Sequence, residues 1–175
     1  MIPLPNTRHC FVCGLENQGG FALQVLREHQ AAVSRFRFRP DWCGFPGTVH
    51  GGLVATALDE IMVWAVGVAS GRMTYCAELS VRYQRPTRPD VEVTARGELT
   101  ANRRDRLFLA SATLVDPEGT LLAEATGKYL PVPEELLPDM LADFVGDPAS
   151  VFRAASGMPD ASGPANSSST TPPPP

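Results

Sequence analysis

The chain has 175 residues, of which 43% are hydrophobic and 19% are charged, and a chain of this length and composition can bury one core. Its formal net charge is −4, which argues against a nucleic-acid partner because phosphate-binding proteins usually carry a basic face. The longest apolar run, 61–69, is far shorter than the ~20 residues of a membrane-spanning helix. No membrane segment is therefore expected.

The N-terminus lacks a secretory signal, and the C-terminal tail is poor in apolar residues. The N-terminus, from Met1 to Cys10, lacks the charged start, apolar run and cleavage site of a secretory signal, so we expect a cytoplasmic protein whose four cysteines are reduced thiols. Residues 154–175 are rich in Ser, Pro, Gly and Ala, and such a segment buries too little apolar surface to offset the entropy of ordering. This tail is expected to be disordered.

The first half of the chain predicts a hairpin followed by one long helix. Segments 21–27 and 33–38 read as two strands, and the Gly/Pro-rich segment 40–48 leads from them to the helix. Nearly every position in 51–70 is apolar, and the segment has no proline, which predicts a long helix buried on most of its surface. Gly71 supplies the stop. The polar residues Thr56, Asp59 and Glu60 lie at i, i+3 and i+4 and form one narrow stripe on this helix.

The second half of the chain alternates with the period of strands. Segments 73–83, 91–99, 107–115 and 121–130 are the predicted strands, and Pro131 and Pro133 end the last one. In 73–83 the alternation places one set of residues on a buried face, namely Met73, Tyr75, Ala77, Leu79, Val81 and Tyr83. It places the other set opposite, namely Thr74, Cys76, Glu78, Ser80 and Arg82.

One helix and six strands indicate the class α+β, because an antiparallel sheet curled around the helix covers it economically. This arrangement, a long central helix wrapped by a six-stranded antiparallel sheet, suggests a hotdog fold. The expected organisation is an N-terminal segment 1–20, a hotdog domain 21–133 and a C-terminal extension 134–153, in which 134–144 can form a short helix. The tail 154–175 follows.

Asp59 is the residue that most needs an explanation. An ionised carboxylate on an apolar helix costs several kcal/mol unless polar groups accompany it. Two readings fit the residues alone: the stripe faces water and Asp59 is an ordinary surface acid, or Asp59 is held in a partly desolvated cleft as a nucleophile or general base.

The segment 47–60, Gly-Thr-Val-His-Gly-Gly-Leu-Val-Ala-Thr-Ala-Leu-Asp-Glu, resembles the active-helix signature of the PaaI-like acyl-CoA thioesterases, a branch of the hotdog superfamily, with an acidic residue nine positions after the histidine. The run Tyr83-Gln84-Arg85-Pro86 and the N-terminal Cys10-x-x-Cys13-Gly14 are similar to further parts of that family. The likeness covers roughly residues 10–131.

The resemblance implies that Asp59 is the reactive carboxylate and that the amide of Gly51 holds the oxyanion. Gly51 and Gly52 allow close approach to the positive end of the helix dipole, although the same glycines also suit a tight entry into the helix. Glu60 is expected to be solvated or ion-paired.

Eight helical steps separate Gly51 from Asp59, or ~12 Å at 1.5 Å per residue, so one chain cannot supply both groups to one carbonyl. Two antiparallel helices related by a twofold axis can, and the family's dimers or dimers of dimers imply the same arrangement.

The supporting residues are less defined. His50 is either an orienting donor near the thioester or a structural cap. Where relatives carry Ser or Thr before the Arg-Pro pair, this chain has Cys76, which departs from the family and can equally be a small core residue. Thr74 could supply the missing hydroxyl, and Gly44 replaces an asparagine of some relatives.

Arg85 is a candidate for the phosphates of CoA, as are Arg82 and Arg88 or the arginines at 103, 104 and 106. A zinc site could be composed of four residues whose side chains can bind the ion, namely His9, Cys10, Cys13 and Cys43. No second Cys-x-x-Cys pair follows, however, so no metal and no other cofactor is expected.

The expected function is hydrolysis of an acyl-CoA thioester by a homodimer or homotetramer. The alternative from another class is a non-catalytic hotdog module that binds acyl-CoA or acyl-carrier ligands. A hydratase is disfavoured, because that chemistry generally pairs the aspartate with a histidine further along the same helix and 61–70 contains none.

Overall fold

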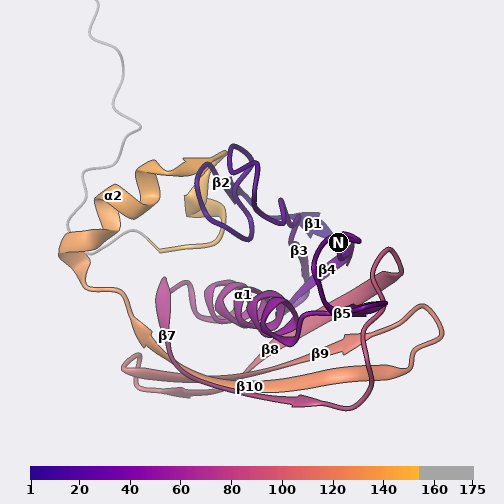
Figure 1. The fold of residues 1–175 in the computed structure, drawn as a ribbon. Coiled ribbons are helices and arrows are strands. Elements are labelled where there is room, and N and C mark those ends of the chain that lie inside the picture. Colours follow the sequence, from indigo (N-terminus) through magenta and orange to yellow (C-terminus); the bar gives the residue numbers. More distant parts are fainter. Residues whose placement is uncertain (154–175) are drawn as a thin grey trace, which may run out of the picture.

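A computed structural model describes residues 1–153, and the predicted disordered tail lies outside this range. The helix α1 spans Gly51–Ser70, which confirms the predicted bounds. His50 caps its N-terminus, where the side chain accepts a hydrogen bond from the Gly52 N–H, and Gly71 ends it in the left-handed conformation with φ 72°. Figure 1 shows α1 lying across the concave face of the sheet.

The main sheet is antiparallel and contains seven strands in the order β1-β3-β4-β8-β9-β10-β7. Its members are β1 (Ile2–Pro3), β3 (Leu26–Glu28), β4 (Ala31–Arg37), β7 (Thr74–Tyr83), β8 (Glu92–Arg103), β9 (Leu107–Val115) and β10 (Leu121–Pro131). All six predicted strands are present, and the N-terminal segment adds β1. The predicted strand 21–27 is shorter than expected, because Phe21 and Leu23 bond through their N–H groups to the carbonyls of Phe11 and Val12 instead.

The core lies between α1 and the sheet. One face of the helix is fully buried there, with Ala57, Leu58, Ile61, Met62 and Ala65 all inaccessible. By length and composition α1 could cross a membrane, since an 18-residue window reaches a mean hydropathy of 1.6. In this fold the same helix packs as the central element of the core, with 56% of that window buried.

The predicted faces of β7 are wrong at its beginning. Tyr75 was expected on the buried side and Thr74 opposite, yet Thr74 is buried and Tyr75 is 43% exposed. A bulge is the cause. Cys76 pairs with Tyr129 and Glu78 pairs with Lys128, which leaves Ala77 without a partner. One extra residue reverses the alternation. The bulge therefore places on one face of the strand Thr74, Cys76, Leu79 and Val81.

Two short pairs complete the fold. The segment before α1 forms a hairpin of β5 (Cys43–Phe45) and β6 (Thr48–Val49), and β2 (Asn6–Thr7) pairs with β11 (Phe144–Val145). The predicted helix near 134–144 is a 3₁₀ turn, η1 (Glu134–Leu136), followed by α2 (Leu137–Ala142); η2 (Pro148–Ser150) comes last.

The N-terminal segment and the C-terminal extension form one layer. Figure 1 shows β2 and α2 on the side of α1 that faces away from the sheet. Phe144 and Phe152 of the extension pack on the ring of Trp64, with centroids 6.1 and 5.7 Å away. Helix α1 is thereby covered from both sides over part of its length.

Candidate active site

The N-terminus of α1 presents an unused backbone donor. The Gly52 N–H is taken by Nδ1 of His50 at 3.0 Å, and the N–H groups of Leu53 and Val54 bond to the His50 carbonyl. Within residues 1–153, no acceptor contacts the N–H of Gly51. The donor that the resemblance assigns to the oxyanion is therefore free at the positive end of the helix dipole.

The predicted structural role of His50 as a cap is confirmed. Because Nδ1 accepts the hydrogen bond from Gly52, the proton of the neutral imidazole lies on Nε2. Gly44 lies directly beside this ring, and a Cβ at Gly44 would be 3.2 Å from Cδ2 of His50. A larger residue at this position would press on His50. The exposed edge of the ring remains available as a donor.

The two sequence motifs of the resemblance meet in space. His50 and Gly51 line a cavity of about 430 Å³ together with Tyr83 and Arg85. The hydroxyl of Tyr83 donates a 2.7 Å hydrogen bond to the carbonyl of Gly51, and a Cβ at Gly51 would meet the Tyr83 ring at 3.3 Å. Glycine therefore permits the tyrosine to lie against the helix end.

Arg85 lies between this cavity and a second groove. The groove has a volume of about 550 Å³ and also contains Arg88 and the acidic residues Asp116 and Glu118. Among the described residues, no carboxylate forms a salt bridge with Arg85 or Arg88, whereas Arg82 lies 3.8 Å from Glu124. Unpaired guanidinium groups beside a cavity suit an anionic ligand such as a phosphate.

Asp59 lies two turns further along α1 and has partners that the sequence did not indicate. Its Oδ1 accepts a 2.8 Å hydrogen bond from the hydroxyl of Tyr129 on β10. Burial and the charge of Asp59 both raise the pKa of Tyr129, which keeps the phenol protonated as a donor. Asp59 is half-buried, so it is neither a fully solvated surface acid nor an enclosed charge.

Cys76 lies beside the same carboxylate because of the bulge in β7. Burial, followed by the interaction with Asp59 and its charge, raises the pKa of Cys76 to about 11. The thiol is therefore neutral at physiological pH and is a weak donor where relatives are expected to carry a hydroxyl. Thr74 lines a separate cavity with Glu60 and Trp64.

Glu60 differs from the expectation of a solvated or ion-paired side chain. Its Oε1 accepts a 2.8 Å hydrogen bond from the indole of Trp64, and its Oε2 lies 3.9 Å from the sulfur of Cys10. Burial and then the negative charge of Cys10 raise its pKa to about 7, while a hydrogen bond with Cys13 lowers the pKa of Cys10 to about 5. Glu60 faces the N-terminal segment because residue 60 turns away from Asp59 by one helical step.

The structure thus brings His50, Gly51 and Arg85 to one cavity and groups Asp59 with Cys76 and Tyr129. Gly51 and Asp59 of one chain do not line the same cavity. Tyr129 was missed because nothing in an alternating strand distinguishes a buried tyrosine that packs from one that also donates a hydrogen bond.

Residues 46–123 match the family described as the thioesterase superfamily. The chain is also 29% identical over 127 residues to acyl-coenzyme A thioesterase THEM4 of Bos taurus, a match that covers 71% of this chain and 52% of the relative. The chain therefore spans about half the length of that curated relative.

Solved structures show the same fold. A thioesterase superfamily protein superposes with a TM-score of 0.64 and 26% identity, covering 70% of this chain and 63% of that one. The Escherichia coli PaaI protein from the phenylacetic acid degradation operon has a TM-score of 0.59 and 14% identity, covering 64% and 80%. A Streptococcus mutans protein bound to acetyl CoA has a TM-score of 0.57 and 16% identity, covering 63% and 88%.

The fold and the match define a hotdog protein. Residues 46–123 match the thioesterase superfamily, and the predicted hotdog fold is confirmed by solved structures of that superfamily and by the fold of PaaI.

Proposed function

We propose that this protein hydrolyses an acyl-CoA thioester to a free acid and CoA, with Asp59 as the nucleophile or general base. The observation that carries the proposal is the free Gly51 N–H at the start of the helix that presents Asp59, since an oxyanion donor and a carboxylate are the two groups that thioester cleavage requires. The similarity to an acyl-coenzyme A thioesterase and to a protein bound to acetyl CoA supports this substrate class.

The two groups act on one carbonyl only if two chains contribute. Gly51 and Asp59 lie ~12 Å apart along α1, and a thioester carbonyl requires its donor and its nucleophile within about 3 Å. A twofold axis that sets two α1 helices antiparallel places Gly51 of one chain beside Asp59 of the other. Two equivalent sites then form in each dimer.

The surface has a strand that suits such a partner. β7 is the edge of the sheet, spans ten residues and is largely exposed, including Tyr75 and Tyr83 at 43% and 51%. A long exposed edge strand is a template for pairing with another chain. A second copy bonded to β7 would bring its own α1 toward the exposed side of Asp59, in a homodimer or a dimer of dimers.

The chemistry follows from these positions. As a nucleophile, an oxygen of Asp59 would bond to the carbonyl carbon and form an acyl anhydride while the carbon–sulfur bond breaks and CoA leaves as a thiolate; water would then cleave the anhydride. As a general base, Asp59 would instead take a proton from the attacking water. In both routes the Gly51 N–H stabilises the oxyanion, Tyr129 holds the carboxylate, and Arg85 pairs with a phosphate of CoA.

A thiol-release assay over short-chain, long-chain and aryl acyl-CoAs tests the proposal. Asp59→Asn should keep the dimer and lower kcat by on the order of 10²–10⁴-fold, the range for loss of a positioned base. An unchanged rate would remove Asp59 from the reaction. Single-turnover hydrolysis in ¹⁸O-labelled water separates the routes, because only the anhydride route transfers label into Asp59.

The alternative is a binding module without turnover. Titration with a non-hydrolysable thioester analogue beside the release assay distinguishes the two functions. Binding of the analogue with no release from any acyl-CoA would favour the module.

A further inference from the structure

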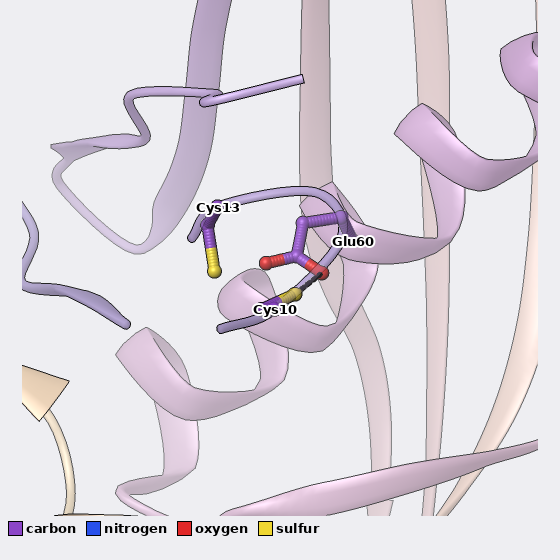
Figure 2. Close-up of side chains that lie close together, drawn as sticks. All are labelled: Cys10, Cys13 and Glu60. Atoms are coloured by element: carbon purple, nitrogen blue, oxygen red, sulfur yellow. Dashed lines mark hydrogen bonds between the residues drawn. The ribbon is translucent and has the colours of Figure 1, made fainter. Parts of the chain in front are cut away.

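Three side chains with metal-binding atoms converge outside the proposed active site. Cys10 and Cys13 lie on the N-terminal loop and Glu60 lies on α1, and their sulfur and carboxylate atoms are all within 4.8 Å of one another. Figure 2 shows both sulfurs and the carboxylate directed toward one point. The sulfur of Cys10 lies 3.9 Å from Oε2 of Glu60, which is close to the ~3.6 Å between neighbouring ligands around a tetrahedral ion with metal–sulfur bonds of ~2.3 Å and metal–oxygen bonds of ~2.0–2.2 Å.

The loop that carries the cysteines is shaped to hold them. The N–H of Val12 donates a 3.3 Å hydrogen bond to the sulfur of Cys10, and the hydroxyl of Thr7 lies 3.5 Å from the sulfur of Cys13. A Cβ at Gly14 would lie only 2.3 Å from the carbonyl oxygen of Cys10, so the turn requires glycine there. Hydrogen bonds to ligating atoms orient them and tune their affinity for a metal.

A second, independent feature points to a ligand at this place. Cys10, Cys13 and Glu60 line a cavity of about 330 Å³ that also contains Thr74. Thr74 is 94% buried, from its exposed fraction of 6%, and within residues 1–153 its hydroxyl has no hydrogen-bond partner. A buried hydroxyl without a partner costs about 1–3 kcal/mol, and water bound to a metal ion in the cavity would supply the partner.

We propose that Cys10, Cys13 and Glu60 form a zinc site that links the N-terminal loop to α1. Two thiolates favour a thiophilic ion, and one carboxylate is a common third ligand of Zn²⁺. Three protein ligands leave the fourth position of a tetrahedral ion for a water molecule. The site lies one residue from Asp59, so it also anchors the part of α1 that carries the reactive carboxylate.

This ligand set differs from the one that sequence spacing alone allowed. His9 is not available, because its ring is engaged by the carboxylate of Asp143. Cys43 belongs to β5 and its thiol donates to the carbonyl of Pro40 at 3.3 Å. The third ligand is instead Glu60, which lies 50 positions from Cys10 in the chain, and no local motif indicates it.

Metal titration of the reduced, chelator-treated full-length protein tests the site. Zn²⁺ alone should bind at one ion per chain in competition with a chromophoric chelator, and Co²⁺ alone should produce a near-ultraviolet thiolate-to-cobalt band. Cys10→Ser and Cys13→Ser should each abolish or halve that band and weaken Zn²⁺ binding by on the order of 100-fold or more, since even the loss of an outer partner costs 10–100-fold. Cys43→Ser is the matched control and should bind like the wild type.

Glu60→Gln keeps the size of the side chain and provides a second test should a cysteine variant fail to fold by circular dichroism. It should weaken Zn²⁺ binding by at least about 10-fold while the thiolate band persists. The proposal is overturned if the reduced wild type takes up no stoichiometric Zn²⁺, if Cys10→Ser and Glu60→Gln both bind like the wild type, or if Cys43→Ser loses the ion as well. None of these readouts depends on thioesterase activity.

Discussion

The hydroxyl of Tyr129 donates a 2.8 Å hydrogen bond to Oδ1 of Asp59, across 70 positions of the chain. Hydrogen bonds to charged groups contribute about 1.5–3 kcal/mol. If the bond positions the carboxylate for reaction, Tyr129→Phe should lower kcat by about 10- to 100-fold and leave KM nearly unchanged. Steady-state thiol release measures both constants.

Tyr75→Phe is the control for removing a phenol hydroxyl. Tyr75 lies on β7, and within residues 1–153 its hydroxyl forms one hydrogen bond, to the sulfur of Met140 at 3.6 Å. This variant should retain the wild-type rate. Equal rates for Tyr129→Phe and Tyr75→Phe would show that Tyr129 serves packing alone.

The oxyanion donor can be deleted without breaking the helix. Gly51 is the first residue of α1, where proline is favoured, and His50 has φ −61° and ψ 128°, which are suitable for a residue before proline. Gly51→Pro therefore removes the N–H while keeping the helix, adds a Cβ beside the Tyr83 ring, and should lower kcat by about 10²–10³-fold. Gly51→Ala adds a similar contact with Tyr83 but keeps the N–H. The difference in kcat between the two variants therefore measures the loss of the donor. A comparable loss in both variants would assign the effect to crowding.

Cys76 should react slowly with alkylating agents despite its exposure. With a pKa of about 11, only about one molecule in a thousand carries the reactive thiolate at pH 8. Iodoacetamide labelling of Cys76, followed by peptide mass spectrometry, should rise about tenfold per pH unit from pH 7 to pH 10. Asp59→Asn removes the negative charge that raises this pKa and should accelerate labelling at pH 8. A plateau near pH 8, or no effect of Asp59→Asn, would contradict the coupling.

Thr74 should be a source of instability in the metal-free protein. Thr74→Val replaces an unpartnered buried hydroxyl with a methyl group, which should raise the free energy of unfolding by about 1 kcal/mol and Tm by about 2–4 °C. Thr74→Ser keeps the hydroxyl and should not stabilise. Thermal unfolding in the presence of a chelator measures the difference. Destabilisation by valine would mean that the hydroxyl has a partner.

Much of the fold could be predicted because its signals are local. The bounds of α1 follow from an apolar run without proline and from Gly71, whose left-handed conformation ends the helix. The beginning of β7 could not be predicted, since a period of two cannot reveal the bulge at Ala77. That single residue decides whether Cys76 faces Asp59.

The same contrast holds for the site. Asp59 and Gly51 stood out because an acid and two glycines are unusual on an apolar helix. Tyr129 and the contact between Glu60 and Cys10 depend on chain segments 70 and 50 positions away, and no spacing within a segment predicts them. The pairing of β2 with β11 over α1 also joins segments that lie far apart in the sequence.

The most direct test of the two-chain site mixes two inactive variants. Asp59→Asn lacks the carboxylate and Gly51→Pro lacks the amide donor, so each homodimer should be nearly inactive. After subunit exchange, half of the dimers are mixed and each mixed dimer has one complete site, which predicts recovery to about a quarter of wild-type kcat. No recovery after exchange, with mixed dimers verified by native mass spectrometry, would show that each site is built from one chain and would contradict the account.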